Sequence, residues 1–241
     1  MQFTYQAYEN LLELLKRHKY QFASYHNYQN YSRCVILRHD IDQSIKKAVS
    51  LGKIEAKTGV SATYFVLLTS DFYNPASRNS IAELRALQDM GHEIGLHFDE
   101  MTYVGNEKTI KSLIQQEADI LSNVLGTAVT TVSMHRPSKR TLESNLMIPD
   151  MINSYGKTFF NDFKYLSDSR RHWREPVLDI ICSEKYDRLH ILTHPFWYHD
   201  DEETISETVS NFVNSGNRAR YSVMSENIAD LSSIMQESEV R

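Results

Sequence analysis

The chain has 241 residues, of which 41% are hydrophobic and 11% aromatic, so it can bury a large core and is not an intrinsically disordered protein. Its formal net charge of -5 argues against nucleic acid or an anionic membrane surface as the main partner. No stretch approaches the ~20 apolar residues of a membrane span, and the N-terminal segment lacks the pattern of a signal peptide. We therefore expect a soluble, cytoplasmic protein.

Helical and strand-like patterns alternate along the chain, beginning with a leucine-rich helix over residues 4–18 that we expect to be an edge or lid element. The first half then predicts these elements in order: strand 34–37, helix 44–57, strand 62–67, helix 80–90 ended by Gly91, strand 93–97, helix 107–125 stopped by Gly126, and strand 130–134. The second half predicts strands at 158–160, 178–182 and 189–193 and a last helix near 201–214.

Strands that alternate with helices of this length pair in parallel, with the helices outside the sheet. About seven strands favour an α/β barrel, open or closed, and we expect a single domain over residues 1–241. The chain lacks the Gly-x-Gly-x-x-Gly and Gly-x-x-x-x-Gly-Lys motifs, which weakens dinucleotide and nucleoside triphosphate binding as interpretations. The only cysteines, Cys34 and Cys182, lie in apolar runs and are expected to be buried free thiols.

The segment Leu37-Arg38-His39-Asp40-Ile41-Asp42 closes an apolar strand with two carboxylates at positions i and i+2. Because strand side chains alternate between faces, Asp40 and Asp42 point to one side and His39 to the other. Two carboxylates at a strand end need a partner or a metal, so one of them can hold a divalent cation while the other takes a proton. The alternative for Asp42 is the N-cap of the helix that follows.

Further polar residues stand at the ends of other predicted strands: His97 and Asp99, His135 and Arg136, and His194. This clustering predicts a shared site at one end of the barrel. His39 and His92 are expected to be structural, since the first points away from the carboxylates and the second stands at the entrance of a strand. We expect Arg136, fixed by Pro137, to form an ion pair with Asp40.

Aromatic residues accompany two of these positions. The segment from Thr193 to Tyr198 places Trp197 beside His194, a composition typical of a sugar-binding rim, although a buried histidine in an aromatic cluster is the competing interpretation. Asp168 and Trp173 lie in the segment SDSRRHW, which on its own could be an ordinary loop.

Together these motifs resemble the polysaccharide deacetylase family, with the NodB homology of carbohydrate esterase family 4, from about residue 34 to residue 197. The segments that carry the resemblance are RHDID, ATYFV, GHEIGLH, HRPS, SDSRRHW and LTH. The resemblance implies a distorted (β/α)7 barrel and one divalent metal ion, usually zinc, with nickel or cobalt as alternatives. The combination LRHDID, GLHFD, HRPS and THPFW is similar to a divergent subgroup associated with surface-polysaccharide biosynthesis.

The resemblance also implies a role for each matching residue. Asp40 becomes the catalytic base, Arg136 orients it, and His194 becomes the catalytic acid. Asp168 and Trp173 match the fourth motif, so Asp168 joins the catalytic set, and Trp173 and Trp197 are expected to contact the carbohydrate. The metal ligands implied are Asp42 and His97.

One position departs from the family pattern. The family's second metal histidine stands four residues after the first, and here that position is Met101, a poor ligand for zinc. A third ligand must come from elsewhere, with His135 the first choice because imidazole is a common zinc donor, and Asp99 the second.

The function implied is a metal-dependent hydrolase acting on a non-peptide C–N bond, which removes an N-acetyl or related acyl group from an amino sugar. The absence of an export signal favours a nucleotide-linked or lipid-linked precursor of a surface glycan as substrate. The alternatives are a non-catalytic carbohydrate-binding or scaffold protein with the same barrel, for which Met101 is the best support, and an amidohydrolase acting on a non-sugar amide.

Overall fold

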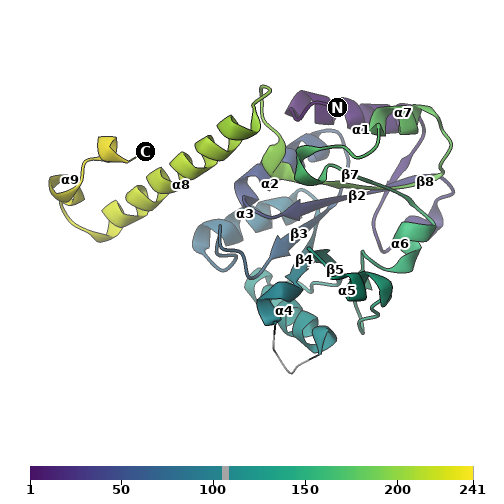
Figure 1. Cartoon of the computed structure of the whole chain (residues 1–241), viewed down its shortest axis with the longest axis horizontal. Coiled ribbons are helices and arrows are strands. Elements are labelled where there is room, and N and C mark those ends of the chain that lie inside the picture. The colour runs from purple at the N-terminus through teal and green to yellow at the C-terminus, as the bar shows by residue number, and fades with distance from the viewer. Residues whose placement is uncertain (105–108, 241) are drawn as a thin grey trace. The chain divides into compact units, whose positions relative to one another are not determined.

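The computed structural model describes residues 1–104 and 109–240, and the chain divides into two compact units (Figure 1). The main unit is Met1–Asp200, and the second begins at Asp201. Neither unit contains, in the part of the chain that is described, a helix both long and apolar enough to cross a bilayer.

The main unit is built on a curled, fully parallel sheet that forms a half-barrel (Figure 1). Seven strands follow one another in the order β6-β5-β4-β3-β2-β8-β7. Their bounds are β2 Cys34–Ile41, β3 Thr63–Leu67, β4 Glu93–Asp99, β5 Thr131–His135, β6 Ile152–Asn153, β7 Lys164–Ser167 and β8 Arg188–Thr193. The short strand β1 (Gln21–Ala23) pairs with the first half of β2. Strand β3 pairs on the same side with the second half of β2, which begins at Arg38. The expected α/β architecture of a distorted (β/α)7 barrel is thus confirmed as an open barrel.

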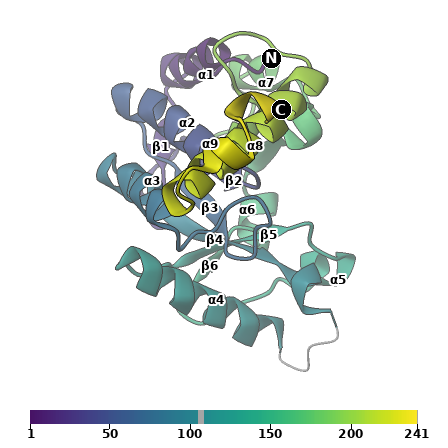
Figure 2. The same cartoon turned by 90° about the vertical axis from the view of Figure 1, so that its left-hand side faces the viewer.

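Helices cover the outer face of this sheet as one continuous layer, in which α7, α1, α2, α3 and α4 each contact the next (Figure 2). Their bounds are α1 Tyr5–Arg17, α2 Ile45–Lys57, α3 Arg78–Asp89, α4 Ile110–Leu125 and α7 Val177–Cys182. The side chains of Thr4, Ser44, Ser77 and Thr109 cap the N-termini of α1 to α4. Short α5 (Lys139–Glu143) and α6 (Lys157–Asn161) follow β5 and β6. The N-terminal helix is therefore a packing element of the barrel wall.

Successive side chains of β2, a central strand, belong alternately to two apolar clusters on the two faces of the sheet. Val35, Leu37 and Ile41 belong to the main apolar cluster, which lies between the sheet and the helix layer. Cys34 and Ile36 belong to a smaller cluster, which also contains Tyr25, Phe65, Phe159 and Phe163. Because strand side chains alternate, Arg38 and Asp40 continue the row of Cys34 and Ile36 and lie on the inner face of the barrel.

Two predicted strands are helices. Residues 158–160 lie in α6 and residues 178–182 in α7. Short apolar runs do not distinguish a strand from a helical segment by pattern alone, and in α7 the buried residues Val177 and Ile181 stand four apart, as one face of a helix requires. Cys182 is correspondingly exposed, whereas Cys34 is buried as expected.

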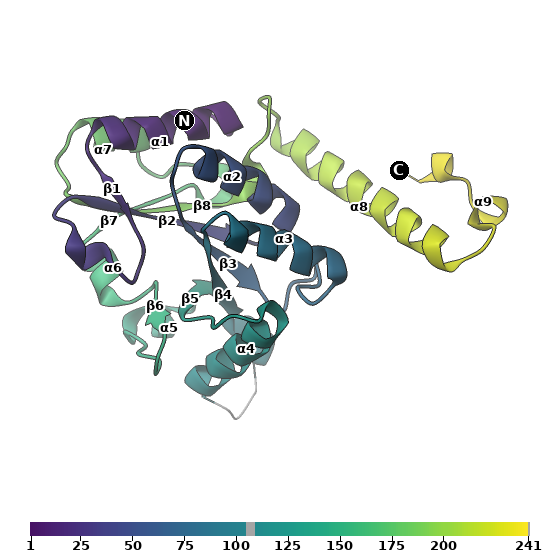
Figure 3. The same cartoon turned by 180° about the vertical axis from the view of Figure 1, so that it is seen from behind.

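The other predicted elements are present with shifted ends. The strand predicted at 34–37 continues to Ile41 and that at 93–97 to Asp99, so each reaches its polar end residues. The start predicted for the fourth helix, Glu107, lies outside the described residues; the described helix runs from Ile110 and ends at Gly126 in a left-handed conformation. Strands β1, β6 and β7 were not predicted (Figure 3).

The second unit is mainly one long helix, α8 (Ile205–Asn227), followed by α9 (Leu231–Ile234). A capping box begins α8: the Thr204 hydroxyl accepts from the Glu207 backbone, and the Glu207 carboxylate accepts from the Thr204 backbone at 2.7 Å. The helix predicted near 201–214 therefore starts four residues later and extends much further.

Candidate active site

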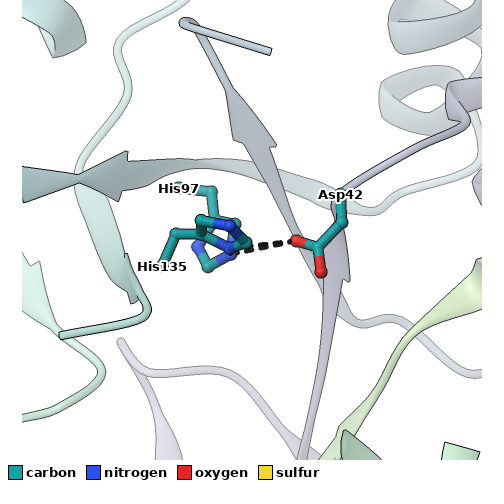
Figure 4. A group of neighbouring side chains, drawn as sticks. All are labelled: Asp42, His97 and His135. Carbon is teal, nitrogen blue, oxygen red and sulfur yellow. Dashed lines mark hydrogen bonds and ion pairs between the residues drawn. The ribbon is translucent and has the colours of Figure 1, made fainter. Parts of the chain in front are cut away.

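Three side chains in or directly after strands β2, β4 and β5 converge near the C-terminal edge of the sheet (Figure 4). Asp42 follows β2 directly, His97 lies in β4, and His135 ends β5. Asp42 Oδ1 lies 3.3 Å from His97 Nε2 and 3.3 Å from His135 Nδ1, and the two imidazole nitrogens lie 3.1 Å apart. Parallel strands bring these residues together because their carboxyl ends share one edge of the sheet.

These three atoms fit the ligand set of a divalent metal ion. Ligands about 2.0–2.1 Å from a tetrahedral zinc stand about 3.3 Å from one another, which is close to the three distances observed. Asp42 Oδ1 is buried and has no hydrogen-bond partner, so the two ring nitrogens approach it in a geometry that does not satisfy a hydrogen bond. Two imidazoles and one carboxylate are donors that suit zinc, and also nickel or cobalt.

The third member of this group is His135 rather than Asp99. Asp99 is occupied elsewhere, since its carboxylate accepts from the Met101 backbone at 3.0 Å and from Arg136 at 2.9 Å. Met101 is 57% exposed and is not part of the group. His135, the first choice from the sequence for the third ligand, therefore lies in the group, and Asp99, the second choice, does not.

Asp40 lies beside the three-residue group but is held by a different partner. Arg38, two residues earlier on β2, donates from Nε to Asp40 Oδ1 at 3.1 Å and from Nη2 to Oδ2 at 2.8 Å. Burial opposes ionisation of Asp40, but Arg38 and the nearby His97 lower its pKa below the ordinary value. We call Asp42, His97 and His135 the metal-type group. Asp40 Oδ2 lies 3.6 Å from His97 Nε2, which places an ionised carboxylate at the edge of this group.

Arg38 is itself fully buried inside the barrel. It donates to the hydroxyl of Ser133 at 2.5 Å and to that of Ser154 at 3.1 Å, and its guanidinium lies over the ring of Tyr155. These contacts satisfy a charge that would otherwise be costly to bury, and they fix the orientation of the bidentate pair. Arg38, Ser133 and Ser154 were not among the predicted site residues; the sequence signal for Arg38 is its position on the same strand face as Asp40.

The predicted ion pair between Arg136 and Asp40 is wrong. Arg136 is 70% exposed, and its Nη2 donates to Asp99 Oδ2 at 2.9 Å. The physical reason is that Arg38 reaches Asp40 from the same strand face, whereas Arg136 follows the end of β5 and turns over Asp99, which pairs with His135 in the sheet register. Arg136 also has a left-handed backbone, with φ of 49°.

His194 and Asp168 form a pair on the opposite side of Asp42. His194 Nδ1 lies 2.6 Å from Asp168 Oδ1, and the His194 backbone donates to both oxygens of the same carboxylate at 3.1 Å. Burial disfavours the charged imidazole, but Asp168 outweighs it and raises the pKa of His194 to about 9. His194 Nε2 lies 3.9 Å from Asp42 Oδ2, and the Tyr198 hydroxyl donates to Asp168 at 3.2 Å.

A cavity of about 570 Å³ opens beside the metal-type group. Asp42, His135 and Arg136 line it on one part of its wall. The remaining lining residues come from the loop after β2, from the end of β3 and the loop that follows it, and from the end of β4 and the short 3-10 helix that follows it: Gln43, Leu67, Thr69, Ser70, Asp71, Phe72, Asp99, Met101 and Thr102. The site therefore has room for a small substrate next to the three ligand atoms.

The two tryptophans lie elsewhere. Trp173 is only 9% exposed and belongs to the main core, next to a separate cavity that Met1 and Val177 also line. Trp197 is partly buried, packs against the same core, and contacts the ring of Phe196. The expected rim role of Trp173 does not fit this burial, and the exposed aromatic ring in the cavity wall is that of Phe72.

His39 and His92 are structural, as expected. His39 lies on the outer face of β2, where Nε2 is 2.8 Å from Glu55 and Nδ1 is 2.6 Å from the Thr193 hydroxyl. His92 contacts the Gly52 carbonyl through Nε2 at 3.0 Å. Both side chains have partners in the layer between sheet and helices, away from the inner face that carries Asp40.

No protein-family model and no curated protein sequence matches the chain. Solved structures are similar to it, among them three that each match it over about three quarters of this chain. The family 4 domain of a multidomain xylanase from the hindgut metagenome of Trinervitermes trinervoides has 16% identity, with 76% of this chain and 80% of that chain covered and a TM-score of 0.45. The family 4 carbohydrate esterase of Streptomyces lividans has 17% identity, 75% and 84% coverage, and a TM-score of 0.45.

The third is a family 4 pseudoenzyme from Bacillus anthracis, with 16% identity, 78% of this chain and 62% of that chain covered, and a TM-score of 0.42. All three carry the name of the family that the sequence motifs resemble. Roles for individual residues follow from the geometry of this chain and not from these similarities.

Proposed function

We propose that the protein is a metal-dependent hydrolase that removes an N-acetyl or related acyl group from an amino sugar. One observation carries this proposal: the group formed by Asp42, His97 and His135 has both an ionised carboxylate and a carboxylate-held imidazole beside it. Asp40 Oδ2 lies 3.6 Å from His97 Nε2, and His194 Nε2, whose ring is held by Asp168, lies 3.9 Å from Asp42 Oδ2. Hydrolysis of an amide needs a base for water and an acid for the leaving amine on either side of the scissile bond.

Asp40 is suited to act as the base. Both of its oxygens accept from Arg38, so the carboxylate is fixed and remains ionised at neutral pH. Arg38 always carries its charge, so the pair holds Asp40 ionised and oriented beside the three ligand residues without making it one of them. A second lone pair on each oxygen stays available to take a proton from water.

His194 is suited to act as the acid. Asp168 holds Nδ1, and Nε2 lies toward Asp42, so the proton on Nε2 is directed at the region of the metal-type group. With its pKa raised to about 9, His194 carries that proton at neutral pH and can transfer it to the nitrogen of the departing amine. Asp168 orients the ring and stabilises its positive charge, so it acts through His194.

When bound by Asp42, His97 and His135, a zinc ion or similar divalent cation would polarise the acyl carbonyl and lower the pKa of water. The resemblance to the polysaccharide deacetylase family supports the amino-sugar substrate. Burial of Trp173 in the core favours the second candidate, an amidohydrolase acting on a small non-sugar amide, because it removes one of the two aromatic residues expected to contact a sugar.

The test begins with metal content. We expect the purified protein, loaded with zinc and desalted, to retain close to one metal ion per chain by plasma mass spectrometry. Asp42→Ala and His135→Ala should lose most of that metal, because each removes one of three ligands. Met101→Ala, at the exposed position in the same cavity wall, is the matched control and should retain it.

Activity is then measured as acetate released from N-acetylated amino sugars and from small non-sugar amides. Asp40→Asn should keep the metal and lose at least about a hundredfold in kcat, since it removes the base and not a ligand. A protein that keeps stoichiometric zinc but releases no acetate from any of these compounds would rule out the hydrolase and support the non-catalytic alternative.

A further inference from the structure

Arg136 is not needed to orient the base, because Arg38 does so from inside the barrel. Arg136 lines the same cavity as Asp42 and His135, and its side chain is 70% exposed. Its Nη2 is engaged by Asp99, while a guanidinium carries five N–H donors in a planar fork. Donors therefore remain accessible at the mouth of the cavity.

The backbone at Arg136 has an unfavourable conformation. Arg136 adopts φ of 49°, a left-handed conformation that is uncommon for a residue with a side chain, and it does so directly before Pro137. On one side the chain is fixed by His135 in β5, and on the other by Ser138, which caps α5. Strained positions of this kind persist where the surroundings enforce them, and they occur often at ligand-binding sites.

A second contact makes the loop rigid. Glu100, in the short 3-10 helix η2 (Glu100–Tyr103) after β4, accepts from the Ser138 backbone and from the Thr141 hydroxyl. The loop that carries Arg136 is thus tied to the loop after β4 on the same side of the cavity. A guanidinium on a rigid loop loses less entropy on binding an anion than one on a mobile loop.

The charged residues that line the cavity favour binding of an anion at Arg136 rather than beside the loop after β3. Among the described residues that line the cavity, Arg136 is the one arginine or lysine, whereas Lys139 is paired with Glu143 and Arg140 borders a different cavity. Of the acidic residues in the wall, Asp42 belongs to the metal-type group, and Asp99 accepts from a single nitrogen of Arg136, so it does not occupy all five N–H donors of the guanidinium. Asp71 is the acidic residue left on the loop after β3, and it would disfavour an anion there.

We infer that Arg136 is the anion-binding residue of the substrate site and takes the phosphoryl group of a phosphorylated N-acyl amino sugar. Arg and phosphate form paired, charge-assisted hydrogen bonds, which suits recognition of a sugar phosphate or of the diphosphate that links a sugar to a nucleoside or a lipid. The inference rests on the proposed function, because it places the acyl group at the metal-type group and the phosphate at Arg136.

The experiment compares kcat/KM for N-acetylglucosamine, its 1-phosphate, uridine diphosphate N-acetylglucosamine and a lipid diphosphate N-acetylglucosamine. We expect the zinc-loaded protein to prefer one or more phosphorylated sugars over the neutral sugar by at least about tenfold. In Arg136→Gln that ratio should fall about tenfold, mainly through a higher KM, and Arg136→Lys should restore part of it. The nucleotide and lipid substrates show which source of the diphosphate is used.

Lys139→Gln is the control, since it removes the same charge from an exposed position three residues away. A ratio that is equally high in the wild type and in Arg136→Gln would overturn the inference and leave the proposed function standing, because the phosphate would then bind at the metal or elsewhere. A wild type without any preference for phosphate would overturn it in the same way.

If no compound is hydrolysed, the proposed function fails, and calorimetric binding of N-acetylglucosamine 1-phosphate and of N-acetylglucosamine still tests Arg136. Tighter binding of the phosphorylated sugar in the wild type that is lost in Arg136→Gln but kept in Lys139→Gln would support the anion-binding role. Equal binding by the wild type and Arg136→Gln would overturn it.

Discussion

At the scale of single residues, the bidentate pair of Arg38 and Asp40 is the most consequential contact in the barrel. Both side chains are buried, and they come from positions i and i+2 of one strand. Ion pairs buried in this way tolerate the joint replacement of both partners better than the loss of one, because a lone buried charge has no compensation.

We expect Arg38→Met to lower the free energy of unfolding by about 3–5 kcal/mol, because it leaves Asp40 charged and unpaired in the barrel. The double variant Arg38→Met/Asp40→Leu should recover a large part of that loss. Arg136→Met, an exposed arginine, should change stability by no more than about 0.5 kcal/mol. Urea unfolding at neutral pH measures all three, and equal effects of the two single arginine variants would contradict the assignment.

The residues of the site differ in how far sequence could predict them. Asp42 and His194 follow strands directly, His135 ends one, and His97 stands two residues before the end of β4. The alternation of strand side chains with parallel pairing is enough to bring such positions together. The same alternation places Arg38 on the strand face of Asp40, but the burial of its charge inside the barrel depends on the hydroxyls of Ser133 and Ser154, which lie far away in the sequence and were not predicted.

At the scale of elements, β8 carries a buried histidine, His190, that the proposed chemistry does not use. His190 lies on the inner face between two outward residues, Leu189 and Ile191, and its Nε2 is 2.7 Å from the Tyr25 hydroxyl. Burial, reinforced by the charge of Arg38, lowers the pKa of His190 to about 3. The ring is therefore neutral in the folded protein at any pH near neutrality.

This pKa predicts a loss of stability in mild acid. Below the unfolded pKa of about 6.5, the unfolded chain binds a proton at His190 that the folded protein excludes, so the free energy of unfolding falls as pH decreases toward 3. The contribution amounts to about 1.4 kcal/mol per pH unit. Between pH 7 and pH 5 the wild type should lose about 2 kcal/mol more than His190→Gln, as measured by urea unfolding. Parallel losses in the two proteins would show that His190 is protonated in the fold.

The short elements of the second half could not be assigned from the hydrophobic pattern of the sequence. Both α6 and α7 have five or six residues, and their apolar composition is as compatible with a strand as with a helix. Their identity is decided by tertiary packing: Phe159 of α6 contacts the rings of Tyr25 and His190, which lie in distant parts of the chain.

At the scale of the whole molecule, the core is confined to the main unit. The buried residues of both apolar clusters run from Phe3 to Tyr198. The strands, the metal-type group and the pair of His194 and Asp168 lie within the same span. The repeating alternation of strands and helices predicted this parallel architecture, but strand order and the division at Asp201 depend on contacts distant in sequence and were not predicted.

We therefore expect a chain that ends at Asp200 to fold and to bind metal. It should keep its far-ultraviolet circular dichroism per residue apart from the lost helix α8, and it should retain close to one zinc ion per chain. The physical reason is that truncation removes no residue of either apolar cluster. Loss of cooperative unfolding in the truncated chain would show instead that residues 1–241 behave as a single domain.

The two faces of β2 carry two separate polar networks: Arg38 and Asp40 point into the barrel, and His39 points out toward Glu55 and Thr193. Insertion of one codon between Arg38 and His39 would exchange the faces of the residues that follow, moving the imidazole inward and the carboxylate under the helices. A single added residue would therefore separate Arg38 from its partner and turn both polar networks toward surroundings that cannot satisfy them.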